Sequence, residues 1–96
     1  MKTLELSTKD AIKYLKDNVK IHDKLEIAYD RIFAEGEVLN VDFSQYFGKE
    51  GFKLMISLDE SDLGGTIEID VYEVEKDIIE FVHYPADGES VEVTVI

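Results

Sequence analysis

The chain has 96 residues, no cysteine and a formal net charge of −12, which excludes a disulfide framework and a thiolate metal site. Its length corresponds to a single domain, residues 1–96, and a hydrophobic content of 45% is too high for a disordered acidic tail. No apolar run is long enough for a signal peptide or a membrane span. We therefore expect a cytoplasmic protein.

The negative charge is concentrated in the second half of the chain. Residues 1–48 hold nine acidic and seven basic side chains, whereas residues 49–96 hold thirteen acidic side chains against Lys49, Lys53 and Lys76. Such a field repels nucleic acid and anionic membranes and favours basic protein surfaces. The alternative, that the acidity only keeps a small protein in solution, stays open.

A first helix is predicted from Ser7 to Asn18. Ser7 is placed to accept a hydrogen bond from the backbone of Asp10 at the helix start, and the apolar residues that follow recur at helical spacing. We expect Lys9, Lys13, Lys16 and Asp17 to face water.

A second helix is predicted over residues 23–36. Leu25, Ala28, Tyr29, Ile32 and Phe33 fall at helical spacing, and Gly36 stands where a helix C-cap is expected. The rival interpretation is a strand through Leu25, Ile27 and Tyr29, which breaks down at Arg31. The pattern therefore favours the helix.

The next segment, residues 37–50, is the least clear. Val38–Val41 has the character of a short strand, and Asp42 is placed to cap one helical turn that ends at Gly48. Three aromatic residues in this turn, Phe43, Tyr46 and Phe47, indicate a core plug beneath a loop more than a ligand-stacking site.

From Phe52 onward the hydrophobic period changes from 3.6 to 2, which predicts four strands. They cover residues 52–58, 64–72, 77–84 and 90–96, and Asp87-Gly88 marks a tight turn before the last one. Short connections favour a meander. The expected fold is α+β, with two N-terminal helices packed on one face of a four-stranded antiparallel sheet in a two-layer sandwich.

The predicted sheet would have one acidic face. Ile67, Ile69 and Val71 alternate with acidic residues, as do the valines of the last strand, so the carboxylates should share the uncovered side. With the turn that follows Leu58 and two nearby tyrosines as apolar anchors, the candidate partner-binding residues are Asp59, Glu60, Asp62, Glu68, Asp70, Tyr72, Glu80, Tyr84 and Glu92.

Catalytic and metal-binding patterns are weak. The turn at residues 59–65 does not fit an EF-hand loop, because neither Gly64 nor Gly65 at position 6 leaves oxygen ligands at positions 5 and 12. His22 and His83 have no paired ligand spacing, and a structural, hydrogen-bonded role is the default for His83. We expect no enzyme activity, no cofactor and no metal.

In charge and size alone, the chain is similar to small acidic inhibitors: phage or plasmid anti-restriction proteins, anti-CRISPR proteins and immunity proteins that block nuclease toxins. Carboxylates on the predicted acidic face would be spaced on the same order as the charges of a nucleic-acid backbone. Together with the resemblance, this spacing predicts an inhibitor that covers the basic surface of a nucleic-acid-binding protein or nuclease by charge mimicry, with no direct nucleic-acid or membrane binding. The alternative is an assembly domain that forms a homodimer through the last strand, residues 90–96, if that strand lies at a sheet edge.

Overall fold

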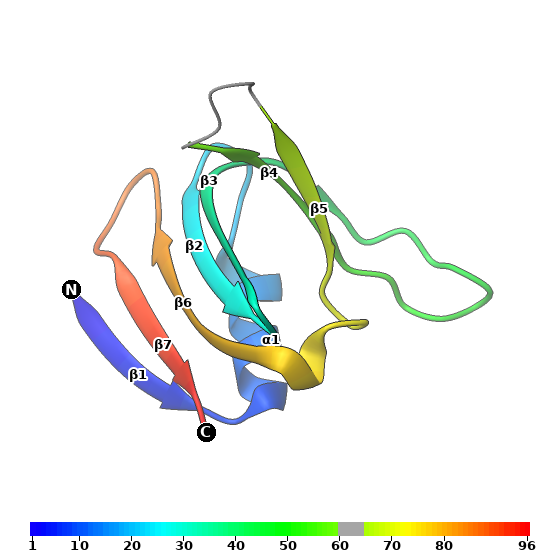
Figure 1. Ribbon diagram of the computed structural model, residues 1–96, viewed down its shortest axis with the longest axis horizontal. Coiled ribbons are helices and arrows are strands. Elements are labelled where there is room, and N and C mark those ends of the chain that lie inside the picture. Colours follow the sequence, from blue (N-terminus) through cyan, green and yellow to red (C-terminus); the bar gives the residue numbers. More distant parts are fainter. Residues whose placement is uncertain (60–64) are drawn as a thin grey trace.

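The computed structural model describes residues 1–59 and 65–96, and within these residues seven strands form one mixed sheet with one α-helix beside it (Figure 1). The elements in chain order are β1 (Lys2–Leu6), α1 (Thr8–Asn18), β2 (Lys24–Tyr29), β3 (Ile32–Asp42), β4 (Lys53–Leu58), β5 (Thr66–Asp70), the short 3-10 helix η1 (Glu75–Asp77), β6 (Ile78–Tyr84) and β7 (Val91–Val95).

The strand order across the sheet is β1-β7-β6-β2-β3-β4-β5. All neighbouring pairs are antiparallel except β1 and β7, which run parallel. The chain leaves β5 at one edge, passes through η1 and enters β6 near the middle of the sheet, while α1 connects β1 at the other edge to β2 (Figure 1).

The predicted two-layer α+β sandwich is therefore wrong. Of the two predicted helices, the described residues contain the first alone, and the sheet is larger and mixed. The first helix is confirmed as α1, with the Ser7 hydroxyl accepting from the Asp10 backbone N–H at 3.2 Å. Residues 2–6, which the sequence analysis left outside the sheet, form β1.

The second predicted helix, residues 23–36, is a hairpin of β2 and β3. Leu25, Ile27 and Tyr29 are buried on one face of β2, so the rival strand interpretation is correct. The strand alternation ends before Arg31 because Asp30, with φ of 55°, and Arg31 form the turn between β2 and β3. The helical period and the strand period both fit these residues. The strand forms because β2 pairs with β3 on one side and with β6 on the other.

Gly36 has a different role from the predicted helix cap. It lies in β3, where β4 approaches so closely that a Cβ atom would overlap the backbone oxygen of Ser57. A side chain does not fit there without moving one of the two strands. The glycine is therefore required by strand packing.

Residues 43–51 form a projecting hairpin, visible as the green loop on the right of Figure 1. Tyr46 and Lys49 pair through their backbones, with Phe47 and Gly48 in the turn at positive φ. The predicted core plug is wrong for Tyr46 and Phe47, which are 69% and 88% exposed. Phe43 is partly exposed and stacks on the buried Phe52 at 5.1 Å between ring centroids.

The four strands predicted after residue 52 are found as β4, β5, β6 and β7, but their arrangement as a meander is wrong. β2 and β3 lie between β6 and β4, so β5 and β6 are far apart in the sheet. β7 pairs with β6 on one side and β1 on the other, so the last strand is not an edge. This removes the structural basis for dimerisation through residues 90–96.

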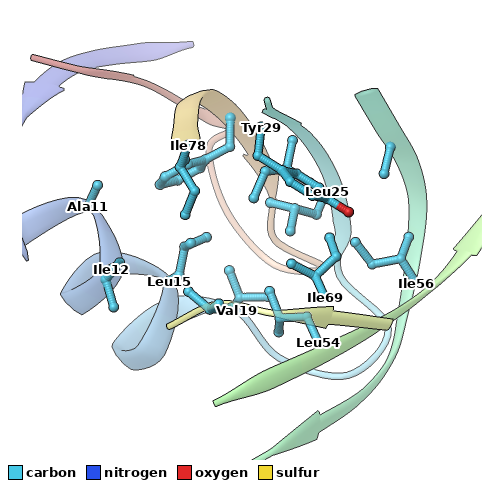
Figure 2. Packing of buried hydrophobic residues seen from close by; sticks show 14 of the residues in the cluster. Ala11, Ile12, Leu15, Val19, Leu25, Tyr29, Leu54, Ile56, Ile69 and Ile78 are labelled. Atoms are coloured by element: carbon cyan, nitrogen blue, oxygen red, sulfur yellow. The ribbon is translucent and has the colours of Figure 1, made fainter. Parts of the chain in front are cut away.

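The hydrophobic core fills the concave side of the curved sheet, with α1 packed against it (Figure 2). From α1, Ala11, Ile12 and Leu15 point toward the apolar side chains of both halves of the sheet, such as Leu54 and Ile78. This arrangement leaves the opposite face of the sheet, here called the outer face, to solvent and to charged side chains.

Candidate binding surface

Glutamates gather on the outer face where β7, β6 and β2 lie side by side. Glu92 is paired with Val82, which is paired with Glu26, so these residues form one row across three strands. Glu80 lies two residues from Val82 on the same face of β6 and is exposed. We call Glu26, Glu80, Glu92 and the adjacent Phe33 the outer glutamate surface.

Phe33 gives this surface an apolar residue at its β3 side. Its side chain is 63% exposed, and its backbone pairs with Ala28, which in turn pairs with Glu80. A hollow of about 100 Å³ is lined by Glu26, Phe33, Glu80, Phe81, Val82 and Glu92. Three carboxylates beside an exposed ring suit an ammonium or guanidinium group. Carboxylates bind such a cation by charge-assisted hydrogen bonds, and an aromatic face binds it by cation–π attraction.

Lys24, the basic side chain nearest to this surface in the strand register, is already paired with two other carboxylates. The Lys24 ammonium lies 3.1 Å from Glu35 and 3.0 Å from Asp59, and 5.9 Å from the centre of the Tyr84 ring. Hydrogen bonds to Asp59 and Glu35 raise the pKa of Lys24 above its usual value. Among residues 1–59 and 65–96, no cation pairs with Glu26, Glu80 or Glu92.

Part of the acidic face predicted from sequence is present here. Glu80 and Glu92 lie in the outer glutamate surface, and the hydroxyl of Tyr84 donates to Glu26 at 3.1 Å. Burial and the nearby Glu26 carboxylate raise the pKa of this hydroxyl. Asp59 contacts Lys24 at the neighbouring end of the sheet.

The other predicted binding residues lie elsewhere. Glu68 and Asp70 are on the edge strand β5, where Lys53 is 4.0 Å from Glu68 and pairs with Asp70 in the sheet register. Tyr72 is half-buried beside α1 and accepts a hydrogen bond from Lys16 at 3.4 Å. Glu60 and Asp62 lie outside the described residues. The strand order, which local patterns do not determine, separates these groups.

Sequence reasoning missed Glu26 and Phe33 because their segment was predicted to be helical. In a helix Glu26 would belong to a capping pair with Asp23, and Phe33 to the apolar face. The strand alternation of Leu25, Ile27 and Tyr29 was the signal that could have placed both on the outer face.

A second polar group, on the covered side of the sheet, was also missed. Asp23 and His83 are 5% and 2% exposed, and His83 Nε2 lies 2.7 Å from Asp23 Oδ2. The Tyr14 hydroxyl on α1 lies 2.8 Å from His83 Nδ1. Because the Asp23 carboxylate accepts from Nε2–H, Nδ1 of a neutral imidazole accepts the Tyr14 O–H. His83 is thus the hydrogen-bonded histidine that the sequence favoured.

The carboxylate of Asp23 has further donors. The backbone N–H groups of Lys20 and Ala86 each donate to it at 3.0 Å. Burial alone would raise its pKa, but the hydrogen bonds from His83, Ala86 and Lys20 lower the pKa below its usual value. Burial, together with the charge of Asp23, raises the pKa of Tyr14. This Tyr14–His83–Asp23 joint ties α1, β6 and the segment before β2 together.

The hydrogen-bonding groups of the Tyr14–His83–Asp23 joint find their partners within the protein. Among the described residues, every buried side-chain polar atom has a hydrogen-bond partner. In the same part of the chain, no group of three or more histidine, cysteine, aspartate or glutamate side chains is arranged to hold a metal ion. The Tyr14–His83–Asp23 joint therefore has the geometry of an internal connection, whereas the glutamates of the outer glutamate surface face solvent without a cationic partner among the described residues.

The residues that the structure describes form a small, mostly β fold with one α-helix and an acidic outer face. Residues 2–94 match the model of a family described as an uncharacterized protein conserved in archaea (DUF2097), so the chain belongs to this family. Neither the curated proteins nor the solved structures include a match to the chain. The expectation of a phage protein of the anti-CRISPR type is wrong, because the family is conserved in archaea.

Within residues 1–59 and 65–96, no helix is long and apolar enough to cross a bilayer.

Proposed function

We propose that this protein is a binding protein whose outer glutamate surface docks onto a basic surface of a partner protein. The observation that carries the proposal is the hollow beside Phe33, which is lined by three carboxylates without a cationic partner among the described residues and by one exposed ring. A lysine or arginine side chain of the partner enters this hollow. Phe33 provides the apolar anchor that a charged surface alone lacks.

The partner in this proposal handles nucleic acid. Proteins that bind DNA or RNA present clustered lysine and arginine side chains, and a net charge of −12 steers the chain toward such surfaces and away from nucleic acid itself. Occupation of the basic surface blocks its access to nucleic acid. The action is non-enzymatic and takes place in the cytoplasm, where a chain without cysteine is at no disadvantage.

The test compares charge reversal on the two sides of the molecule. The chain is used to capture partners from an archaeal extract, and the binding of each captured protein is then measured by surface plasmon resonance. We expect Glu80→Lys with Glu92→Lys to weaken binding by at least about tenfold, and Phe33→Ala to do the same. The matched control, Asp17→Lys with Asp87→Lys, changes the net charge equally on the α1 side of the molecule, where Asp87 lines a hollow with Tyr14 and Asn18, and should have a smaller effect.

The salt dependence gives a second measurement. Attraction between exposed charges is screened beyond about 8–10 Å at physiological ionic strength. Association should slow as salt increases, while dissociation changes less. Binding that is unaffected by salt, or reduced more by the control pair than by the Glu80 and Glu92 pair, would show that the interface lies elsewhere.

A further inference from the structure

A groove lies between α1 and the segment that links β5 to β6. It has a volume of about 630 Å³ and is lined on one side by the first turns of α1 and on the other by Tyr72, Glu75 and Lys76. Ile12 and the ring of Tyr72 provide apolar lining. This volume is within the range of small-molecule pockets, which is about 300–1,000 Å³.

Lysines surround this groove. Lys9, Lys13, Lys16 and Lys76 all line it, and they are four of the ten basic residues in a chain of net charge −12. Lys16 is paired with Glu50. Lys9, Lys13 and Lys76 are exposed and form no ion pair with any residue in 1–59 or 65–96. Asp10 and Glu75 also line the groove, so its balance is positive where most of the surface is negative.

The position of Lys9 is unfavourable for the helix itself. It lies in the first turn of α1, where the aligned peptide dipoles favour an acidic side chain and disfavour a basic one. Lys13 follows one turn later on the same side of the helix, which brings two ammonium groups close together. The first-turn position of Lys9 therefore gives the helix no dipole stabilisation, and an anion in the groove would relieve the repulsion between Lys9 and Lys13.

We propose that the groove binds a small organic anion with a planar apolar body, such as an aromatic acid or a nucleotide. The apolar body lies against Ile12 and Tyr72, and the carboxylate or phosphate contacts Lys9, Lys13 and Lys76. A small ligand fits the charge distribution better than a macromolecule, because a long polyanion would extend into the negative field of the rest of the protein. The site is separate from the outer glutamate surface and does not depend on the function proposed for it.

Two dyes with related aromatic bodies test the requirement for charge. Anilinonaphthalene sulfonate is anionic, and N-phenylnaphthylamine has the same ring system without the sulfonate. We expect the anionic dye to bind at least about fivefold more tightly in fluorescence titrations, with amide chemical-shift changes at residues 8–16 and 72–76. Equal affinity for the two dyes, shifts confined to other residues, or no binding of the anionic dye would overturn the proposal.

Paired substitutions locate the site. Lys9→Gln with Lys13→Gln should weaken binding of the anionic dye by about fivefold, while thermal stability stays the same or increases because the helix dipole is better matched. The control, Lys2→Gln with Lys20→Gln, removes the same charge from lysines that line a different hollow. An equal loss in the control pair would mean that general charge attracts the dye, and the proposal would fail.

Discussion

Strand β6 carries two kinds of charged environment on its two faces. On the covered face, His83 joins the buried Asp23 to Tyr14 through hydrogen bonds of 2.7 and 2.8 Å. On the outer face, Glu80 is exposed and pairs with no cation of the described residues. The difference separates two environments for acidic side chains. A buried carboxylate with several donors stabilises the fold, whereas an exposed carboxylate without a cation contributes little to stability and is the group that the proposed function assigns to a partner.

The largest expected effect is at the joint. His83→Ala removes a donor from the buried Asp23 carboxylate and leaves a cavity between α1 and β6, so we expect a loss of about 3 kcal/mol in unfolding free energy. Urea denaturation followed by circular dichroism measures this. Glu80→Ala, on the outer face of the same strand, is the matched control and should change stability by less than about 1 kcal/mol. Comparable losses would contradict the contrast between the two faces.

Acidification should weaken the joint through Asp23. The pKa of Asp23 is lower in the folded protein than its usual value of about 3.9, so its contribution to stability is present above that value and is lost as the pH falls toward the folded pKa. We expect the urea midpoint of the wild type to decrease more steeply below about pH 4 than that of Asp23→Asn. Parallel curves would show that other carboxylates dominate the acid response.

Tyr14→Phe tests the link from the joint to α1. The change removes the O–H that donates to His83 Nδ1 and keeps the ring, which lies 5.7 Å from Phe81 between centroids. We expect a loss of about 1 kcal/mol, the usual net value of one hydrogen bond. Tyr46→Phe at the exposed hairpin is the control and should be neutral in the same assay.

The smallest expected effect is on the outer glutamate surface and has the opposite sign. Glu80→Gln with Glu92→Gln reduces repulsion between neighbouring strands, so stability should increase by about 0.2–1 kcal/mol. Differential scanning calorimetry at low and at physiological salt measures the gain, which should shrink as salt screens the charges. A decrease in stability would reveal a hydrogen bond or ion pair at these glutamates.

The sequence predicted local structure better than arrangement. The capping serine and the apolar spacing identified α1, period-2 alternation identified β4, β5 and β7, and a run that is apolar on both faces identified β6, because all of these signals depend on neighbours in the chain. Residues 24–35 satisfied a helical and a strand period together, and pairing with β6, far along the chain, decides between them. Glu26 and Phe33 could not be assigned to the surface until that pairing was known.

The same limit applies to the buried joint. Asp23 and His83 are 60 residues apart, and Tyr14 and His83 are 69 residues apart, so no sequence spacing indicates that the three side chains meet. The strand order likewise separates Glu68 and Asp70 from Glu80 and Glu92, although all four residues alternate with apolar neighbours as predicted.

The parallel pairing of β1 with β7 has a consequence for the order of folding. β1 is an edge strand whose neighbour in the sheet is β7, so residues 2–6 find their place after residues 91–95 have been synthesised. Contacts between such distant segments close a long loop and slow the rate-limiting step of folding. During synthesis on the ribosome, β1 therefore remains unpaired at a stage when the hairpin of β2 and β3 is already able to form.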